Sequence, residues 1–219
     1  MKNKILSLLE HIENDAQKQH YFRLITTLLE KGYFPGLEEV PVVKSTISHF
    51  DAQTGLLTFR GYPVEELADH CCFEEVCFLL LYGDLPLNEE IIQIKNKLLS
   101  YIYLPQDLAD LITKLNKDIS PMNMLSATVL LLEASDKNLD NVDNHRENLD
   151  RILRLIAKIP TIIGTFITGN VDFNKTHKYT SFVQYILFCY NPQLAEDEKL
   201  VKLLEKLLIL NMDYAMKNS

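Results

Sequence analysis

The 219-residue chain contains 47% hydrophobic residues but only 7 glycines and 8 prolines, which is typical of a globular protein with one sizeable core or two small ones. Its formal charge of -8 comes from 30 acidic against 22 scattered basic residues, so the basic stripe of a nucleic-acid-binding protein is not expected. No apolar run approaches the roughly 20 residues that span a bilayer. The residues after Met1 also lack a secretory apolar block, so we expect no membrane partner and a cytoplasmic location.

Residues 1–32 carry two successive apolar stripes at helical spacing, the first formed by Ile5, Leu8, Leu9 and Ile12 and the second by Phe22, Ile25, Leu28 and Leu29. We interpret residues 1–34 as a helical amino-terminal extension and residues 35–219 as the main domain. The extension has two readings, a packing arm that covers a core or extends a dimer contact, and a regulatory element. The packing arm is favoured because amphipathic stripes usually bury against their own protein.

Residues 42–60 change to an alternating, β-branched pattern around the segment Asp51-Ala52-Gln53-Thr54-Gly55. Asp and Gly supply turn chemistry in such segments. The pattern predicts one short β-hairpin near the amino terminus.

After Pro63, which can open a helix at its first turn, the pattern is helical throughout. Breaks are expected at Gly83, Pro86, Pro105 and Pro121 and in the polar run 136–144. The predicted helices span residues 63–69, 73–82, 88–102, 105–115, 121–135, 146–168, 177–189 and 194–216. The predicted fold class is therefore all-α, a multi-helix bundle with one short hairpin.

Two of these helices are unusually apolar. Residues 122–132 are nearly free of charge, and residues 152–167 contain only Arg154 and Lys158 as charged groups. Because a helix that is hydrophobic all round must be buried on all sides, we expect both to be enclosed. Pro160 removes one hydrogen bond and should kink its helix, or the helix breaks there.

Isolated polar residues give only weak site candidates. The six histidines lack metal-ligand spacing, so no metal site is predicted; they are His11, His20, His49, His70, His145 and His177. The pairs Glu65-Glu66 and Glu74-Glu75 lie beside predicted helix starts, where a capping role is favoured over acid–base chemistry. Of the four cysteines, the adjacent Cys71 and Cys72 cannot chelate one ion as a C-x-x-C pair does, and Cys77 and Cys189 lie in apolar runs. All four are expected to be reduced.

Four motifs follow one another in a recognisable order: Gly36-Leu37-Glu38-Glu39-Val40, Arg60-Gly61-Tyr62-Pro63-Val64-Glu65-Glu66-Leu67, Phe73-Glu74-Glu75-Val76, and Leu79-Leu80-Leu81-Tyr82-Gly83-Asp84-Leu85-Pro86. Their order and spacing resemble the amino-terminal half of the large domain in citrate synthases and 2-methylcitrate synthases. The resemblance implies an all-α bundle of the citrate synthase large-domain type. For Arg60-Gly61-Tyr62, a turn fixed by Gly61 is the simplest account.

Enzymes of this family are acyltransferases of the tricarboxylic acid cycle type, which condense acetyl-CoA or propionyl-CoA with oxaloacetate. The resemblance implies these substrates and no tightly bound cofactor. In the family, the proton-moving groups lie in a P-x-H-G-G-x-N segment, a G-H-R-x-Y segment and a later Asp, all beyond the position that matches Ser219. The sequence therefore assigns no catalytic residue, and we expect the isolated chain to lack activity.

A substrate-binding segment does fall inside the chain. The family motif is H-A-D-H-E-x-N-A-S in many relatives and x-S-E-H-E-M-P-N-S in some methylcitrate-type ones, and it matches residues 211–219. The match implies substrate-binding positions at Asn211, Tyr214 and Asn218, with Asn218 and Ser219 retained from the second form. Tyr214 replaces the histidine that hydrogen-bonds the oxo acid, and Ala215 replaces the Glu. A phenol stays neutral near pH 7, whereas an imidazole can become cationic and pair with a carboxylate.

Several interpretations of the whole chain remain open. It could be a truncated, inactive synthase, one half of a split synthase that a separate chain completes, or a non-catalytic module that associates with an intact synthase. The reading frame could also continue past Ser219. The matching segment that begins at Pro121, together with Ala157-Lys158-Ile159-Pro160-Thr161, which matches a family A-K-M-P-T helix, implies a homodimer or association with a citrate synthase chain.

Overall fold

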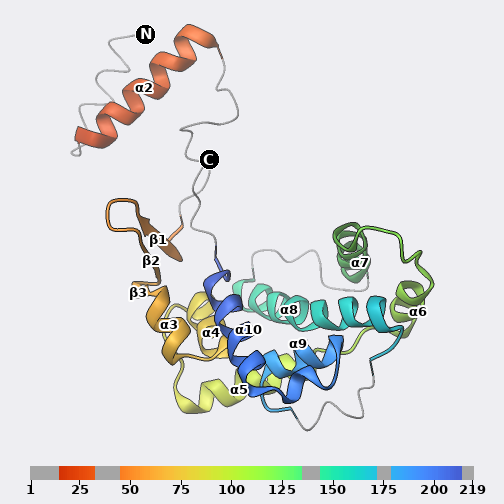
Figure 1. Ribbon diagram of the computed structural model, residues 1–219. Coiled ribbons are helices and arrows are strands. Elements are labelled where there is room, and N and C mark those ends of the chain that lie inside the picture. The colour runs from red at the N-terminus through yellow and green to blue at the C-terminus, as the bar shows by residue number, and fades with distance from the viewer. Residues whose placement is uncertain (1–14, 33–44, 135–143, 172–178, 214–219) are drawn as a thin grey trace. The chain divides into compact units, whose positions relative to one another are not determined.

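The computed structural model describes residues 15–32, 45–134, 144–171 and 179–213, and Figure 1 shows its elements. These residues belong to two compact units, one that holds residues 15–32 and 45–46 and one that holds residues 47–213. The division into an extension of residues 1–34 and a main domain of residues 35–219 stays a prediction.

The first unit contains helix α2, Asp15–Lys31. Its range matches the second of the two predicted amino-terminal stripes, whereas the first stripe lies outside the described residues. Leu24 is the buried side chain of α2, while Phe22, Leu28 and Leu29 are exposed. Both interpretations of this helix, as a packing arm and as a regulatory element, therefore remain possible.

The second unit begins with a three-stranded antiparallel sheet, formed in order by β1 (Ser48–Asp51), β2 (Leu56–Phe59) and β3 (Tyr62–Pro63). The predicted hairpin is confirmed, because Ser48 pairs with Phe59 and Asp51 with Leu56. Asp51 closes the turn by accepting hydrogen bonds from the Gln53 amide at 2.8 Å and the Thr54 hydroxyl at 2.7 Å.

The third strand was not predicted. Arg60 and Gly61 both have positive φ, 50° and 92°, which turns the chain back within two residues and pairs Phe59 with Tyr62. Pro63 was expected to open a helix, but it lies at the sheet edge and at the N-cap of α3, where its missing amide donor costs no ladder bond.

The rest of the second unit is helical, which confirms the predicted all-α class. Its helices are α3 (Val64–His70), α4 (Phe73–Tyr82), α5 (Asn88–Ser100), α6 (Gln106–Lys114), α7 (Pro121–Ala134), α8 (His145–Thr168), α9 (Phe182–Tyr190), the 3₁₀ turn η3 (Leu194–Glu196) and α10 (Glu198–Leu210). α8 runs without interruption through Pro160, so the alternative that the helix breaks there is wrong.

Two predicted helices have different limits, and side-chain caps explain both. α9 begins at Phe182 rather than at residue 177, because the Ser181 side chain accepts the Val183 amide and caps the helix. The predicted helix 194–216 is divided, because Asp197 accepts the amides of Lys199 and Leu200 at 3.0 and 3.2 Å and starts α10 anew. α10 ends at Leu210, and residues 214–216 of the prediction lie outside the described part.

Helix α8 is the organising element of the second unit. It contacts α5, α6, α7 and α9, and Figure 1 shows α6 and α7 at one end of it and α9 alongside. α8 approaches α9 closely at Gly164, where an added Cβ would meet the Cys189 carbonyl oxygen at 2.7 Å. Glycine therefore allows α8 and α9 to approach closely.

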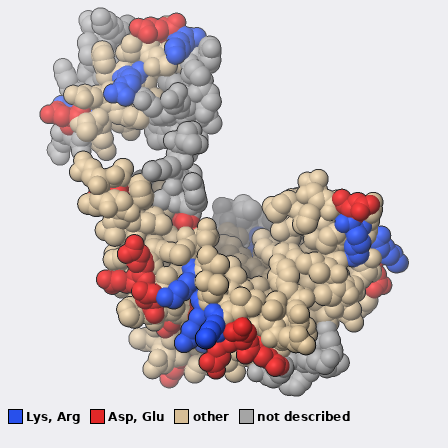
Figure 2. All heavy atoms as spheres, in the orientation of Figure 1, with Lys and Arg blue, Asp and Glu red and all other residues tan. Residues whose placement is uncertain are grey.

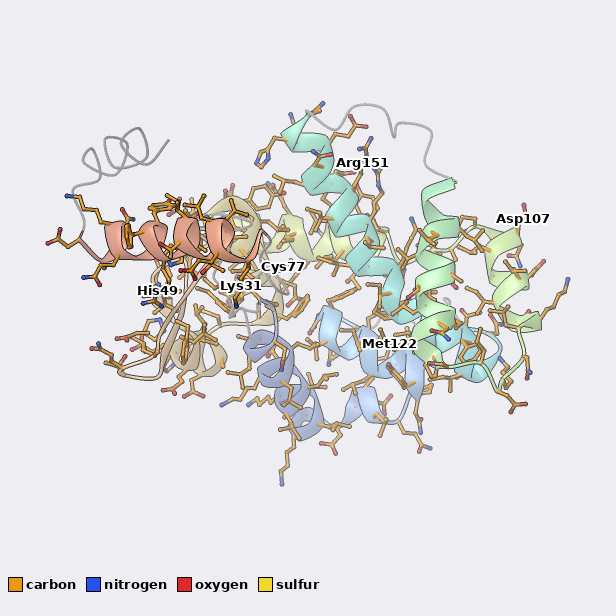
Figure 3. All side chains as sticks on the ribbon, turned by 90° about the horizontal axis from the view of Figure 1, so that it is seen from above. Lys31, His49, Cys77, Asp107, Met122 and Arg151 are labelled. Atoms are coloured by element: carbon orange, nitrogen blue, oxygen red, sulfur yellow. The ribbon has the colours of Figure 1, made fainter. Side chains whose placement is uncertain are left out.

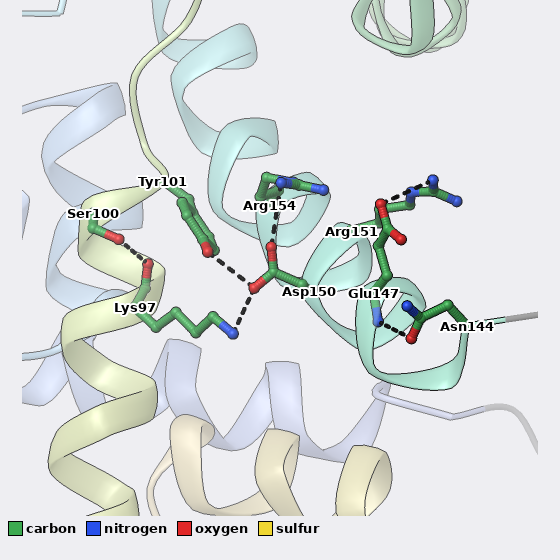
Figure 4. Close-up of polar contacts among 8 residues, drawn as sticks. All are labelled: Lys97, Ser100, Tyr101, Asn144, Glu147, Asp150, Arg151 and Arg154. Atoms are coloured by element: carbon green, nitrogen blue, oxygen red, sulfur yellow. Dashed lines mark hydrogen bonds and ion pairs between the residues drawn. The ribbon is translucent and has the colours of Figure 1, made fainter. Parts of the chain in front are cut away.

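A polar network joins α5 to α8. Asp150 accepts hydrogen bonds from the Tyr101 hydroxyl at 2.9 Å and the Lys97 ammonium at 2.5 Å, and it pairs with Arg154 at 3.2 Å, as Figure 4 shows. The carboxylate thus links the end of α5 to the first turns of α8.

The sequence predicted that the apolar helix α7 is enclosed on all sides, and this prediction is wrong for the single chain. The helix packs on α6 and α8 through buried Met124 and Thr128, but Met122 and Leu130 are 66% and 67% exposed. Figure 3 shows Met122 on α7. The prediction fails for the single chain because α6 and α8, the helices that contact α7 most among the described residues, leave these side chains uncovered.

Candidate functional site

The candidate site begins where α10 ends, and the apolar contacts of α10 determine where that end lies. Ile209, in the last turn, is fully buried in a cluster that also contains Phe59, Val64, Leu67, Val76 and Leu79. These residues come from β2, α3 and α4. Ile209 therefore fixes the last turn of α10 against three other elements.

Two polar contacts set the rotation and register of α10. The Glu205 carboxylate accepts the amide of Phe73, the first residue of α4, at 3.1 Å. Lys206, the next residue, pairs with Asp69 of α3 at 2.5 Å. Burial and the charges of Glu74 and Glu75 raise the pKa of Glu205, which the Phe73 amide and Lys95 oppose.

Asn211 occupies the C-cap of α10. Its backbone amide donates to Leu208 O at 3.0 Å, and its side-chain amide donates to Leu207 O at 2.8 Å. Met212 follows and packs against two core clusters. The other two predicted substrate-binding residues, Tyr214 and Asn218, lie outside the described residues, so the three positions remain a prediction.

Arg60 and Glu75 have the structural roles that the sequence predicted. One guanidinium nitrogen of Arg60 donates to Leu80 O at 3.0 Å, which attaches the turn at Gly61 to α4. Glu75 accepts the Cys72 amide at 2.6 Å and forms a capping box at the start of α4. Figure 3 shows His49 on the sheet and Cys77 on α4, and the described residues contain no group of three or more side chains that could hold a metal ion.

Glu74 has a role that the sequence did not reveal. It was assigned to the start of its own helix, but it is fully buried, and one carboxylate oxygen accepts the amide of Phe182, the first residue of α9, at 2.8 Å. Its other oxygen has no hydrogen-bond partner among the residues that the structure describes. Glu74 and Glu205 thus attach α4, α9 and α10 to one another through the amide groups at helix starts.

The cysteines are free thiols. Cys77 and Cys189 are buried in the largest core cluster, as predicted for small apolar side chains. Burial raises the pKa of Cys77 to about 12, so this thiol stays protonated near neutral pH.

On the face that Figure 2 shows, the basic side chains of the described residues lie in small separate groups beside acidic ones. Within the same residues, no helix is long and apolar enough to cross a membrane.

Comparison with known proteins identifies the family. Residues 36–219 match the family model described as "Citrate synthase, C-terminal domain". The chain is 33% identical over 187 residues to citrate synthase 1 of Mycobacterium tuberculosis, which covers 82% of this chain and 43% of that protein. It is 30% identical to the peroxisomal citrate synthase of Dictyostelium discoideum over 200 residues, with 85% and 41% covered.

Solved structures show the same fold. The citrate synthase of Thermotoga maritima matches with a TM-score of 0.68 and 26% identity over 84% of this chain and 47% of its own. The Thermoplasma acidophilum enzyme, in a ternary complex with carboxymethyl coenzyme A and oxaloacetate, matches with a TM-score of 0.71 at 22% identity, over 84% of this chain and 48% of its own.

The chain spans less than half the length of these curated relatives. The family match nevertheless covers most of the chain and includes all four sequence motifs, and the helical bundle agrees with the solved structures. The chain therefore belongs to the citrate synthase family.

Proposed function

We propose that this chain supplies the large-domain scaffold of a citrate synthase-type enzyme, which condenses acetyl-CoA or propionyl-CoA with oxaloacetate. The observation that carries the proposal is the fixed end of α10. Ile209, Glu205 and Lys206 hold this end against α3 and α4, and Asn211, which caps it, is the first residue of the segment that matches the oxo-acid-binding motif. The substrates named in the Thermoplasma complex belong to the same reaction class.

Residues 211–219 are proposed to hold the oxo acid through Asn211, Tyr214 and Asn218. The Tyr214 phenol can donate one hydrogen bond to a substrate carboxylate or ketone, but it carries no positive charge near pH 7. A charge-assisted bond to a buried carboxylate is worth about 1.5–3 kcal/mol, so Tyr214 should hold the substrate roughly ten- to a hundredfold more weakly than a histidine at this position.

The polypeptide of residues 1–219 is proposed to lack turnover by itself. Its sequence contains no P-x-H-G-G-x-N or G-H-R-x-Y segment, and the family reaction needs a positioned base and enol-stabilising groups in a closed cleft. Those groups would come from further residues of the same protein or from a separate chain.

A reconstitution experiment tests this function. The chain is mixed with a carboxy-terminal half that carries the missing segments, and release of free CoA thiol is followed with acetyl-CoA and oxaloacetate. We expect turnover only from the mixture, and Tyr214→His should lower the apparent KM for oxaloacetate by about tenfold or more. Tyr214→Phe, which lacks the donor, should raise it. Failure of every partner half to bind or to restore turnover would contradict the proposal.

Exposed apolar side chains favour association as a second property. Met122 and Leu130 of α7 and Ile152 of α8 are large and exposed, and patches of this kind mark protein interfaces. We propose that these helices form a homodimer or bind an intact citrate synthase chain, which would also suit a non-catalytic module. Sedimentation equilibrium should detect a dimer that Met122→Asp and Leu130→Asp together dissociate. A monomer that also fails to bind an intact synthase would rule this out.

A further inference from the structure

A cavity of about 420 Å³ lies beside α5 in the second unit and carries no assigned role. Four of its lining residues, Ile92, Lys95, Asn96 and Leu99, are spaced at i, i+3, i+4 and i+7 and so form one stripe along α5. The rest of the wall comes from residues 102–103, which follow α5, and residues 179–180, which precede α9.

The lining divides into an apolar part and a polar part. Leu99, Ile102 and Ile92 provide aliphatic surface, and the rings of Tyr103 and Tyr179 add aromatic surface. A volume of this size lies at the lower end of the roughly 300–1,000 Å³ that small-molecule sites occupy. The cavity therefore suits a compact ligand with an apolar body.

The polar part contains donors and one positive charge. Lys95 forms no hydrogen bond or ion pair with any described side chain, and its charge opposes the rise in the pKa of Glu205 that burial causes. Asn96 and Thr180 also line the cavity. Their amide and hydroxyl groups, with the Lys95 ammonium, can donate hydrogen bonds to a carboxylate.

We propose that this cavity binds a small amphipathic carboxylate, with the anionic group at Lys95, Asn96 and Thr180 and an aryl or short alkyl body against Leu99 and Ile102. The inference does not depend on the proposed condensation reaction. It predicts recognition by charge at one end and by apolar burial at the other.

The test uses 4-phenylbutyrate as the probe and its neutral amide, 4-phenylbutyramide, as the matched ligand. Each is titrated into the 219-residue chain, and the methyl signals of Ile92, Leu99 and Ile102 are followed by NMR. We expect saturable shifts at these methyl groups and tighter binding of the acid than of the amide.

Variants separate charge from shape. Lys95→Met should weaken binding of the acid by about tenfold and leave binding of the amide unchanged. Ile92→Trp, at the exposed rim, should weaken both ligands because it fills the entrance. Lys202→Met, which removes an exposed lysine of α10 outside the cavity, should change neither. Methyl spectra that agree with wild type away from the cavity show that each variant is folded.

Three results would overturn the proposal. The first is a shift that rises linearly without saturation, which indicates surface adsorption. The second is saturable binding reported only by methyl groups away from the cavity. The third is equal affinity for the acid in wild type and Lys95→Met.

Discussion

At the scale of single residues, the glutamates of α4 and α10 show how side chains of one type take different roles. Glu75 caps its own helix, whereas Glu74 accepts the first amide of α9 and Glu205 accepts the first amide of α4. The fold therefore depends on carboxylates that reach between helices as well as on local caps.

Glu74 and Glu75 form a matched pair for mutation. Glu74→Ala leaves the buried amide of Phe182 without its acceptor and should lower the free energy of unfolding by about 1–3 kcal/mol. Glu75→Ala removes a capping-box bond and should cost about 0.5–1 kcal/mol. Urea denaturation followed by circular dichroism measures both. An equal or larger loss in Glu75→Ala would show that the link to α9 contributes little.

Glu205 should make stability depend on pH. Because burial raises its pKa in the folded state, folding favours the protonated form, so its contribution is greatest below the ordinary carboxyl value of 4.5 and declines as pH rises through the raised pKa. Glu205→Gln keeps an acceptor for the Phe73 amide and removes the charge beside Glu74. The variant should gain stability relative to wild type as pH rises from 4.5 to 7.5.

The control for this pH profile is Glu66→Gln, which removes an exposed carboxylate of α3. Denaturation curves at matched pH values are compared for the three proteins. A difference between wild type and Glu205→Gln that stays constant across this range, or that the Glu66 variant reproduces, contradicts the assignment.

At the scale of elements, Asp150 is expected to hold α5 against α8. Burial by itself would raise the pKa of Asp150, but hydrogen bonds from Lys97 and Tyr101 lower it below its ordinary value of 3.8. Its contribution is therefore complete near neutral pH and is lost as pH falls below about 4 through the lowered pKa. Asp150→Asn should cost about 1–2 kcal/mol at pH 7 and progressively less in acid. Denaturation at pH 7 and pH 3 tests this, and an equal cost at both values would refute it.

The crossing of α8 and α9 gives a second element-scale prediction. Gly164→Ala places a Cβ at 2.7 Å from the Cys189 carbonyl oxygen and at 2.8 Å from its Cβ, so the helices must separate. The expected cost is about 1–3 kcal/mol in thermal or urea unfolding. Adding Cys189→Ala should not restore stability, because both clashing atoms remain in alanine. Full recovery in the double variant would assign the strain to the thiol instead.

The sequence predicted the helix ends well where a nearby glycine or proline determines them. Gly83, Pro105 and Pro121 end or open helices close to the expected positions, and the Asp51–Gly55 turn produces the hairpin. The prediction from sequence failed where one residue is compatible with two structural roles. Asp197 could continue a helix or cap a new one, and Pro63 could open α3 or end a strand, so the division of residues 194–216 and strand β3 were not foreseen.

Contacts between residues far apart in the chain could not be predicted from local sequence patterns. The bond from Phe182 to Glu74 joins residues 108 positions apart, and nothing near Glu74 distinguishes it from Glu75. The candidate site was predicted from a family motif alone, and only Asn211 of its three residues is described, at the end of α10.

At the scale of the whole molecule, α10 leaves apolar side chains in solvent. Leu203, Leu207 and Leu210 are exposed, while Leu204 and Leu208 pack on the core. The isolated chain should therefore bind a dye that reports exposed apolar surface. Replacing Leu203 and Leu207 by Lys together should reduce dye binding without loss of helical signal. A wild-type chain with no dye binding and cooperative monomeric unfolding would contradict this.

The most direct test of the scaffold proposal is the condensation rate of the purified, folded chain of residues 1–219 alone. CoA thiol release is measured with saturating oxaloacetate and either acetyl-CoA or propionyl-CoA, and an intact citrate synthase serves as the reference. The proposal predicts a rate equal to that of the reaction without protein. Turnover close to that of the intact enzyme would contradict it, because the groups that move protons would then have to lie within these residues.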